Sequence, residues 1–450
     1  MSESKGPWPR QSGVSRRTVL KGAGLSALTA AGIGSLSACA PAAVGQGGAP
    51  ELDFWHLLGG GDGRRMTEIL ATVNAEMTDA QVKQTVLAWG APYYTKLAMA
   101  SAGGRAPDLA VVHMSRLPGY APGGLLDPWD LDRLAAYDVG EASFTGPTWE
   151  RSQLDGETFA LALDSHAFVS FFNPEILELA GVLDPAGDLV AMSSIEDVID
   201  VGRAIKEVTG TPFPLSYGFL GDGAQMWRLF WTFYTQHGMT FELEGEEFVY
   251  DQEAFAESLE AMRTLVDGEV ASTSADYGTA ISGFLNGDAG LILCGPWELP
   301  QFQDAGMPLG AAPIPNLFGT GIDAAWGDSH TFVLPHQNNP DEEKRELVYE
   351  AVSRILKNSL PWGSAGHTPA YQPVVNTPAF RALEPNAKYA ETANYLQYDP
   401  IASFTGSGSR FQTEFGNSVQ NALIGQVPTQ EAMADFANRV NVLISKSITR

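Results

Sequence analysis

The chain has 450 residues, of which 44% are hydrophobic and 18% are charged, and these values are typical of a globular protein and exclude wholesale disorder. A chain of this length can form two or three domains with cores of their own. Acidic residues outnumber basic residues by 53 to 27, and the net charge of −26 disfavours nucleic acid and anionic lipid surfaces as partners.

The first fifty residues indicate export from the cytoplasm. Residues 15–21 read SRRTVLK, which is typical of a twin-arginine signal, and a run rich in Gly, Ala and Ser follows. Residues 36–39 read LSAC and resemble a bacterial lipobox, in which the cysteine is acylated. We therefore predict a twin-arginine lipoprotein signal peptide over residues 1–38, lipidation of Cys39 and a tether over residues 39–50. An uncleaved N-terminal anchor is the alternative.

The segment after the tether alternates between strands and helices. A strand over residues 52–58 runs into a glycine-rich turn, and a helix follows over residues 64–77. Further strands are predicted over residues 82–89 and 109–113, with a helix over residues 92–102 between them. This alternation predicts an α/β lobe with a largely parallel sheet.

The middle of the chain indicates a crossing between two lobes. A tight turn at residues 154–158 precedes two apolar runs, 159–163 and 167–172, which flank the polar triplet Asp164-Ser165-His166. Two strands joined through a polar triplet, without a helix, suggest that the chain passes here into a second lobe. The elements predicted next are a strand over residues 215–220 and helices over 174–180, 195–208, 224–237, 251–266 and 277–285.

Residues 284–300, which read FLNGDAGLILCGPWELP, place an aromatic side chain at the end of a strand. The apolar run 289–294 is typical of a strand buried on both faces, and Gly295-Pro296 ends it. Trp297 follows at the carboxyl end of that strand, where open α/β sheets place ligands, although it could instead cap a core. Strands over 309–314 and 331–334 are expected to return to the first lobe, and helices are predicted over 341–357, 409–424 and 429–444.

The two cysteines have different predicted roles. Cys294 lies inside the apolar run and is expected to be a small core residue, whereas Cys39 belongs to the export segment. We therefore expect neither a disulfide nor a metal site built from thiolates.

Several segments, taken in order, resemble the extracellular solute-binding proteins of carbohydrate-type ABC importers, and in particular the maltodextrin-binding group. They are LDFWH at 52–56, PDL at 107–109 followed by GYA and GLL, DG at 155–156 through to Asn173, GPW at 295–297 and GHTPA at 366–370. The resemblance implies an α/β, two-lobed periplasmic-binding-protein-like fold, with a ligand cleft between the lobes and multiple hinge crossovers. The expected division is 51–162 plus 312–358 for lobe 1, and 163–311 plus 359–450 for lobe 2.

The resemblance also implies a function. We expect a lipid-anchored extracytoplasmic protein that captures a sugar or oligosaccharide, without catalysis or a cofactor, and delivers it to the permease subunits of an ABC transporter. Such a protein is expected to be a monomer. The alternatives are a secreted glycan-active enzyme that uses Asp164 and Glu298, a binding protein for a non-sugar solute such as a glycerophosphodiester, and a surface lipoprotein with protein partners.

Sugars present C–H faces that pack on aromatic rings and hydroxyls that need planar polar partners. The sequence places such mixtures at strand ends and loops, and the resemblance assigns family positions to several of them, including the Asp164 crossover and the G-P-W tryptophan. Any single one of these side chains could instead belong to a core or a solvated surface. The predicted ligand-binding residues are Trp55, His56, Asp62, Ser115, Arg116, Asp164, His166, Gln225, Trp227, Trp297, Trp326 and His367.

Five of the seven histidines also fall in these loops, namely His56, His113, His166, His330 and His367. No HxxxH or HExxH pattern aligns two of them on one helix. We therefore expect them to form hydrogen bonds or to pack, and we predict no metal site.

Overall fold

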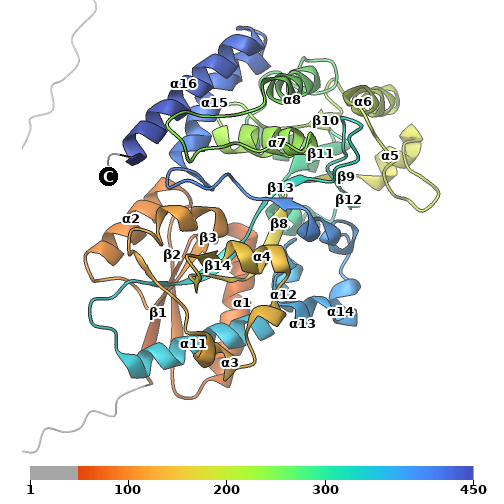
Figure 1. Cartoon of the computed structure of the whole chain (residues 1–450). Helices are drawn as coiled ribbons and strands as arrows, with labels where there is room; N and C mark the ends of the chain where they lie inside the picture. Colours follow the sequence, from red (N-terminus) through yellow and green to blue (C-terminus); the bar gives the residue numbers. More distant parts are fainter. Residues whose placement is uncertain (1–48, 449–450) are drawn as a thin grey trace, which may run out of the picture. The chain divides into compact units, whose positions relative to one another are not determined.

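The computed structural model describes residues 49–448, so the predicted signal peptide and the lipidated Cys39 lie outside the described residues. The described part contains two large hydrophobic cores, each built around its own sheet, and they form a first and a second lobe (Figure 1). This arrangement confirms the expected α/β class.

The first lobe has a mixed sheet with the strand order β2-β1-β3-β14-β4, and β7 also pairs with β14. Strands β1, β2 and β3 run parallel, whereas β14 is antiparallel to β3. All five residues of β3 are apolar or histidine and all are buried, which explains its central place. The bounds are β1 Glu51–His56, β2 Gln81–Val86, β3 Leu109–His113, β4 Leu126–Asp127, β7 Leu161–Ala162 and β14 His330–Pro335.

Helices pack around this sheet and contribute to the same core. Helix α11 shows why a helix starts at a given residue. The side chain of Asp341 accepts hydrogen bonds from the backbone N–H groups of Glu343 and Lys344. Glu342 and Glu343 also lie in the first turn, near the positive end of the helix dipole. The helices are α1 Gly60–Glu76, α2 Ala91–Ala102, α3 Leu131–Ala135, α4 Gly146–Arg151, α11 Glu342–Lys357, α12 Leu360–Gly363 and α13 Gln372–Val375. The predicted turn before Phe159 is present as the hairpin of β5 Gln153–Leu154 and β6 Glu157–Thr158.

The second lobe has a four-stranded sheet with the order β10-β11-β9-β12. Strand β11 lies inside this sheet, is fully buried and ends at Cys294, a free cysteine whose pKa is raised by burial. Cys294 is therefore a core residue, as expected. The strands are β9 Val169–Phe172, β10 Leu215–Ser216, β11 Leu291–Cys294 and β12 Gly310–Pro313.

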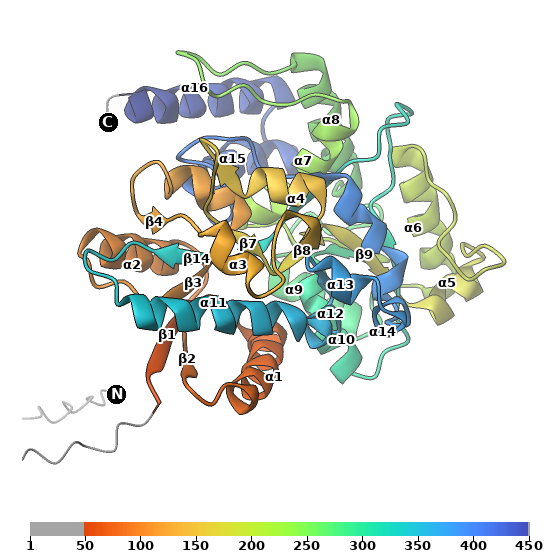
Figure 2. The same cartoon turned by 60° about the horizontal axis from the view of Figure 1, so that its bottom comes forward.

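The helices of the second lobe form an aromatic-rich core around α7, which is buried on nearly every side. Helices α15 and α16 lie side by side, and Figure 2 shows both next to α8. The helices are α5 Pro174–Ala180, α6 Ile195–Thr209, α7 Gly223–Gln236, α8 Gln252–Leu265, α9 Tyr277–Leu285, α10 Leu299–Asp304, α15 Arg410–Leu423 and α16 Thr429–Ile448, and α14 Pro378–Arg381 follows α13.

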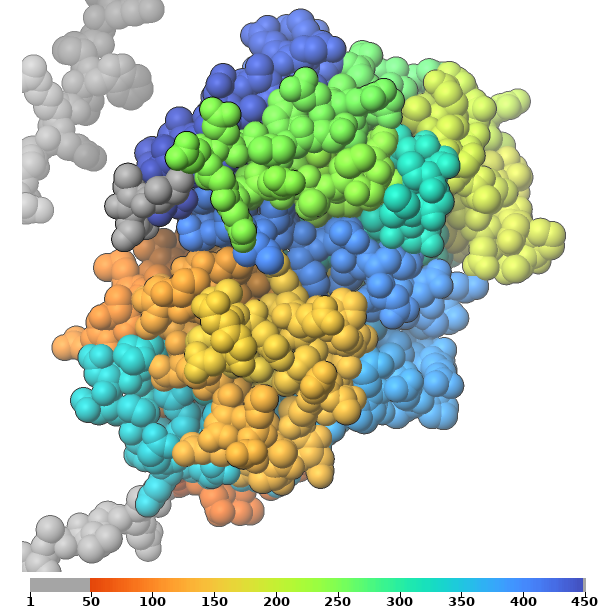
Figure 3. All heavy atoms as spheres, viewed as in Figure 1, coloured from red at the N-terminus to blue at the C-terminus, as the bar shows by residue number. Residues whose placement is uncertain are grey.

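A third sheet, which we call the linking sheet, is formed where the chain passes between the lobes. Its order is β15-β8-β13-β16, with β8 antiparallel to both neighbours. Strand β8 connects β7 of the first lobe to β9 of the second, and β13 connects β12 of the second lobe to β14 of the first. Its strands are β8 Asp164–Ala167, β13 Ala325–Asp328, β15 Thr368–Pro369 and β16 Leu396–Gln397. In the space-filling view, late-chain residues in blue lie between the orange first lobe and the green part of the second (Figure 3).

Two parts of the expected lobe division differ from the structure. Strand β12 does not return to the first lobe, because it pairs antiparallel with β9 in the second sheet. The segment that contains Trp362, Tyr371 and Val374 packs on the first core, although residues after 358 were assigned to the second lobe. Both differences arise from contacts between segments far apart in sequence, which local patterns do not encode. Within residues 49–448 no helix is both long enough and apolar enough to span a bilayer.

Candidate functional site

A cavity of about 760 Å³ is lined by residues of both lobes. The first lobe contributes the glycine turn at the start of α1, the residues that follow β2, and His113 at the end of β3. The second lobe contributes the first turns of α7, Tyr277 at the start of α9, and the short helix η3 Pro296–Glu298 that follows β11. The cavity therefore lies at strand ends and helix starts, where open α/β sheets place ligands.

Two indole rings and a guanidinium group form one part of the wall. The guanidinium carbon of Arg228 lies 4.7 Å from the ring centre of Trp297 and 5.0 Å from that of Trp326. Arg228 is only 8% exposed and forms no ion pair with any residue in the range 49–448. Its Nη1 donates to Oε1 of Gln225 at 3.0 Å, so a cation, an amide and two large aromatic rings meet at the cavity.

A carboxyl group adjoins Trp297. Nε1 of Trp297 donates to the hydroxyl of Tyr277 at 2.9 Å, and that hydroxyl donates to the carboxylate of Glu298. Burial raises the pKa of Glu298, and the negative charge of Asp62 acts in the same direction, while hydrogen bonds from Tyr277 and Gln301 oppose them. Hydrogen-bond donors and acceptors are therefore held in place beside the indole.

Three imidazoles, those of His113, His166 and His330, line another part of the wall. Burial lowers the pKa of His113 well below its ordinary value, because a charged ring would lose its hydration there. Burial also lowers the pKa of His166, to about 4, against the opposing effect of Asp164. At neutral pH the rings of His113 and His166 are therefore uncharged, and each can both donate and accept a hydrogen bond.

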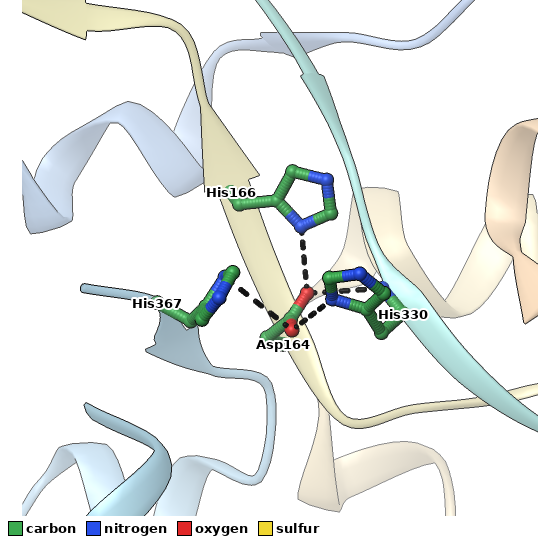
Figure 4. Close-up of side chains that lie close together, drawn as sticks. All are labelled: Asp164, His166, His330 and His367. Atoms are coloured by element: carbon green, nitrogen blue, oxygen red, sulfur yellow. Dashed lines mark hydrogen bonds and ion pairs between the residues drawn. The ribbon is translucent and has the colours of Figure 1, made fainter. Parts of the chain in front are cut away.

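Behind these imidazoles lies Asp164, whose side chain is completely buried (Figure 4). Its Oδ1 accepts from Nδ1 of His166 at 2.9 Å and from the backbone N–H of His330 at 3.0 Å. Its Oδ2 accepts from Nδ1 of His330 at 2.7 Å and from Nε1 of Trp362 at 2.6 Å. Burial opposes ionisation, but the surrounding histidines outweigh it and hold the pKa of Asp164 well below its usual range.

His367 connects this cluster to the cavity. Its Nε2 lies 3.0 Å from Oδ1 of Asp62, and its Nδ1 lies 3.6 Å from Oδ2 of Asp164. Burial disfavours the charged imidazole, but these two carboxylates outweigh that effect and raise the pKa of His367 above its ordinary value.

The structure brings five of the predicted residues to the cavity wall and leaves the others elsewhere. Asp164 and His367 lie behind the wall, Trp227 is buried against Asp399, and Ser115 hydrogen-bonds to Asp328. The five residues at the wall are Asp62, His166, Gln225, Trp297 and Trp326.

Three further predicted residues lie away from the cavity. Trp55 is partly buried on the first lobe, with the ammonium group of Lys96 4.7 Å from its ring centre. His56 is fully buried, and its Nε2 lies 2.9 Å from Oε1 of Gln84. Arg116 donates to the backbone oxygen of Thr405 and stacks on a tyrosine. Their positions next to glycines and strand ends suggested a ligand site, but their side chains serve packing within the fold.

Several wall residues were not among those predicted. Arg228 could have been found, because it lies three residues after Gln225 and therefore on nearly the same face of α7. No local pattern pointed to Trp89, Tyr277 or Gln301 as ligand-facing residues, since their position depends on how the two lobes meet.

Comparison with known proteins agrees with this architecture. The chain matches the family model described as bacterial extracellular solute-binding protein over residues 61–348. A maltotriose-binding protein of Pyrococcus abyssi is 25% identical over 228 residues, which span 50% of this chain but only 45% of that protein. An arabinooligosaccharide-binding protein of Halalkalibacterium halodurans is 24% identical over 355 residues, 74% of each chain.

Among solved structures, the GacH receptor of Streptomyces glaucescens superposes with a TM-score of 0.73 at 18% identity, covering 88% of this chain and 99% of that one. That receptor was determined without ligand and in complex with acarbose. At this level of identity the likeness concerns the fold alone.

Proposed function

Because this chain belongs to the bacterial extracellular solute-binding protein family, we propose that it captures a sugar or oligosaccharide in the cavity between its lobes and delivers it to the permease of an ABC importer. The observation that carries the proposal is the position of Trp297, which lines the cavity instead of being enclosed in one core. An indole at a cavity wall offers a flat apolar face to the C–H groups of a sugar ring.

The polar groups of the wall support the same function. Gln225, Glu298 and His166 place amide, carboxyl and imidazole groups around the two indoles, and a sugar needs such planar partners for its hydroxyls. Hinge closure of the lobes on the ligand would bring the wall residues of the first lobe and those of the second lobe into contact with it.

A binding role is favoured over catalysis. A glycosidase needs two carboxyl groups on either side of the scissile bond. Of the two acids considered for that role, Glu298 lines the cavity, but Asp164 lies behind its wall with both oxygens occupied by hydrogen-bond donors. The two curated relatives described above are likewise named as binding proteins.

One observation favours a second ligand class. Arg228 lines the cavity, is only 8% exposed and has no carboxylate partner in the described part of the chain. A buried cation without a counter-ion can pair with an anionic ligand, so an acidic sugar or a glycerophosphodiester is the alternative to a neutral sugar.

Titration of the purified protein with a ligand panel, followed by tryptophan fluorescence, tests the proposal. The panel contains neutral malto- and arabino-oligosaccharides, uronic-acid oligosaccharides and glycerophosphodiesters. We expect saturable quenching or enhancement with at least one carbohydrate, because the indoles at the cavity wall report on ligand directly. Binding of peptides or polyamines alone would contradict the function, and turnover of a glycoside would favour the enzyme.

We propose further that the protein is held outside the cytoplasm by acylation of Cys39. In cells that make the full chain, we expect the wild type in the membrane fraction and the Cys39→Ser variant in the soluble extracytoplasmic fraction, because the acyl chains supply the attachment. Immunoblotting of cell fractions measures this distribution, and the Cys294→Ser variant is the control. Equal membrane retention of both variants would instead indicate an uncleaved anchor.

A further inference from the structure

Asp164, His166, His330 and His367 bring four potential metal ligands together beside the proposed sugar cavity. One ligand atom from each lies within 4.8 Å of all the others, and all four residues are buried. They come from β8, from β14 and from the residue that precedes β15, three segments that meet in or next to the linking sheet. Figure 4 shows the three imidazole rings around the one carboxylate.

We propose that these four side chains form a binding site for a transition-metal ion of the Zn²⁺ type. The ligands would be Nδ1 of the three histidines and a carboxylate oxygen of Asp164. The protons that Nδ1 of His166 and Nδ1 of His330 now donate to Asp164 would leave these atoms on metal binding, to Nε2 or to solvent. Zn²⁺ binds nitrogen and oxygen at ~2.0–2.2 Å in a tetrahedron, so its ligand atoms lie roughly 3.3–3.6 Å from one another. Nδ1 of His166 now lies 2.9 Å from Oδ1 of Asp164, and Nδ1 of His330 and of His367 lie 2.7 and 3.6 Å from its Oδ2. Because the four ligand atoms lie within 4.8 Å of one another, side-chain shifts of about 1 Å would bring them to the spacing of a tetrahedral site.

The donor set also selects among metals. Three imidazoles and one carboxylate are typical ligands of Zn²⁺, and they also suit Co²⁺ and Ni²⁺. Mg²⁺ and Ca²⁺ prefer oxygen ligands in larger number, and this cluster offers them only one carboxylate. We therefore expect the site to bind Zn²⁺, Co²⁺ or Ni²⁺ in preference to Mg²⁺ or Ca²⁺.

His367 gives the sharpest reason for a cation. Its Nε2 faces the carboxylate of Asp62, so a neutral ring carries its proton there. The remaining Nδ1 is buried, has no hydrogen-bond partner and lies 3.6 Å from Oδ2 of Asp164. In the metal-free chain a second proton on the ring can satisfy these two buried electron-rich atoms, and a bound cation would take the place of that proton.

Residues next to the cluster orient its side chains, as the residues around a metal site do. Asp62 accepts from the far nitrogen of His367, which is the usual way in which a metal-bound imidazole is oriented. Trp362 donates to Asp164 and stacks on the ring of His367, with ring centres 4.8 Å apart. His166 and His330 also line the cavity, so an ion can enter from that side. The site does not depend on which ligand the cavity binds.

The test uses the full chain without a histidine tag, treated with EDTA and then dialysed. Calorimetric titration with Zn²⁺ should show one ion per chain, and Co²⁺ should give the strong visible absorption of a tetrahedral complex with nitrogen and oxygen ligands. The His367→Ala variant should lose at least about 100-fold in Zn²⁺ affinity, and Asp62→Asn about 10–100-fold, the range known for groups that orient a metal ligand.

The His336→Ala variant is the matched control. His336 is also paired with an acid, Asp127, but it lies away from the cluster, so its replacement should leave Zn²⁺ binding unchanged. The proposal is overturned if the wild type binds neither Zn²⁺ nor Co²⁺, or if His367→Ala and His336→Ala bind Zn²⁺ equally well. If His367→Ala does not fold, the wild-type Co²⁺ spectrum decides: octahedral bands overturn the site and tetrahedral bands support it.

Discussion

Replacement of Trp297 by alanine will weaken binding of the carbohydrate ligand by about 1–3 kcal/mol, which corresponds to roughly 5–150-fold in the dissociation constant. The indole offers a flat apolar face at the cavity wall, and that face is lost with the side chain. The substitution also removes one of the two rings that adjoin the Arg228 guanidinium, the one whose centre lies 4.7 Å away, and so weakens the hold on this cation at the wall. Isothermal titration of both proteins with the ligand found in the panel measures the effect.

Trp55→Ala is the matched control for this experiment. Trp55 is also a partly buried tryptophan with a cation next to its ring, Lys96, but it does not line the cavity. We expect its replacement to leave ligand affinity unchanged, although both positions were predicted from sequence as ligand-facing. An equal loss of affinity in the two variants would mean that the cavity described here is not the binding site.

Elements with a strong local pattern could be predicted from sequence. The apolar run LAVVH gave β3 at its observed bounds, and the run that ends at Cys294 gave β11, with Trp297 at its carboxyl end. Helices α7 and α11 start next to Asp222 and Asp341, whose side chains accept backbone N–H groups. The family resemblance, carried by the order of such segments, is confirmed by the match over residues 61–348.

The placement of strands in sheets could not be predicted in the same way. Strand β13 is short and contains Trp326, Gly327 and Asp328, a sequence without an alternating or continuous apolar pattern. It is a strand because it pairs with β8 and β16, and that pairing joins segments far apart in the chain. For the same reason β12 was assigned to the wrong lobe.

The site could be predicted only in part, because the face of an element decides which side chain meets the ligand. On α7, Gln225 and Arg228 are three residues apart and both line the cavity. Trp227 is two residues from Gln225, so it points to the opposite side of the helix and is buried in the core. The histidine cluster is harder still, since residues 164–166, 330 and 367 meet only in the folded chain.

Replacement of Asp399 by alanine will lower the free energy of unfolding by about 3–5 kcal/mol, since each buried donor left without a partner costs roughly 1–3 kcal/mol. Oδ1 of this buried side chain accepts from Nε1 of Trp227 at 2.9 Å and from Nε1 of Trp326 at 2.7 Å. Oδ2 accepts from Nε2 of Gln412 at 3.0 Å. The carboxylate thereby joins α7, β13 and α15, and its loss leaves three donors buried. Urea unfolding at neutral pH measures the change.

Ionisation of Asp399 makes its contribution to stability depend on pH, and this separates the effect of its charge from the effect of its hydrogen bonds. Burial raises the pKa of this carboxyl above its ordinary value, so just above that value the folded chain binds more protons than the unfolded chain. Its contribution to stability therefore falls as pH rises through the folded pKa. Asp399→Asn keeps an acceptor for the indoles but cannot ionise, so we expect a smaller loss of stability than in the alanine variant and a flatter pH profile than in the wild type. The control is Asp304→Ala, which removes an exposed acid paired with Arg64 and should change the free energy of unfolding by no more than about 0.5 kcal/mol.

Asp399 also holds Trp326 at the cavity wall, so the Asp399→Ala variant should bind ligand more weakly even under conditions in which it remains folded. If the folded variant binds ligand with full affinity, Trp326 does not contribute to the binding site.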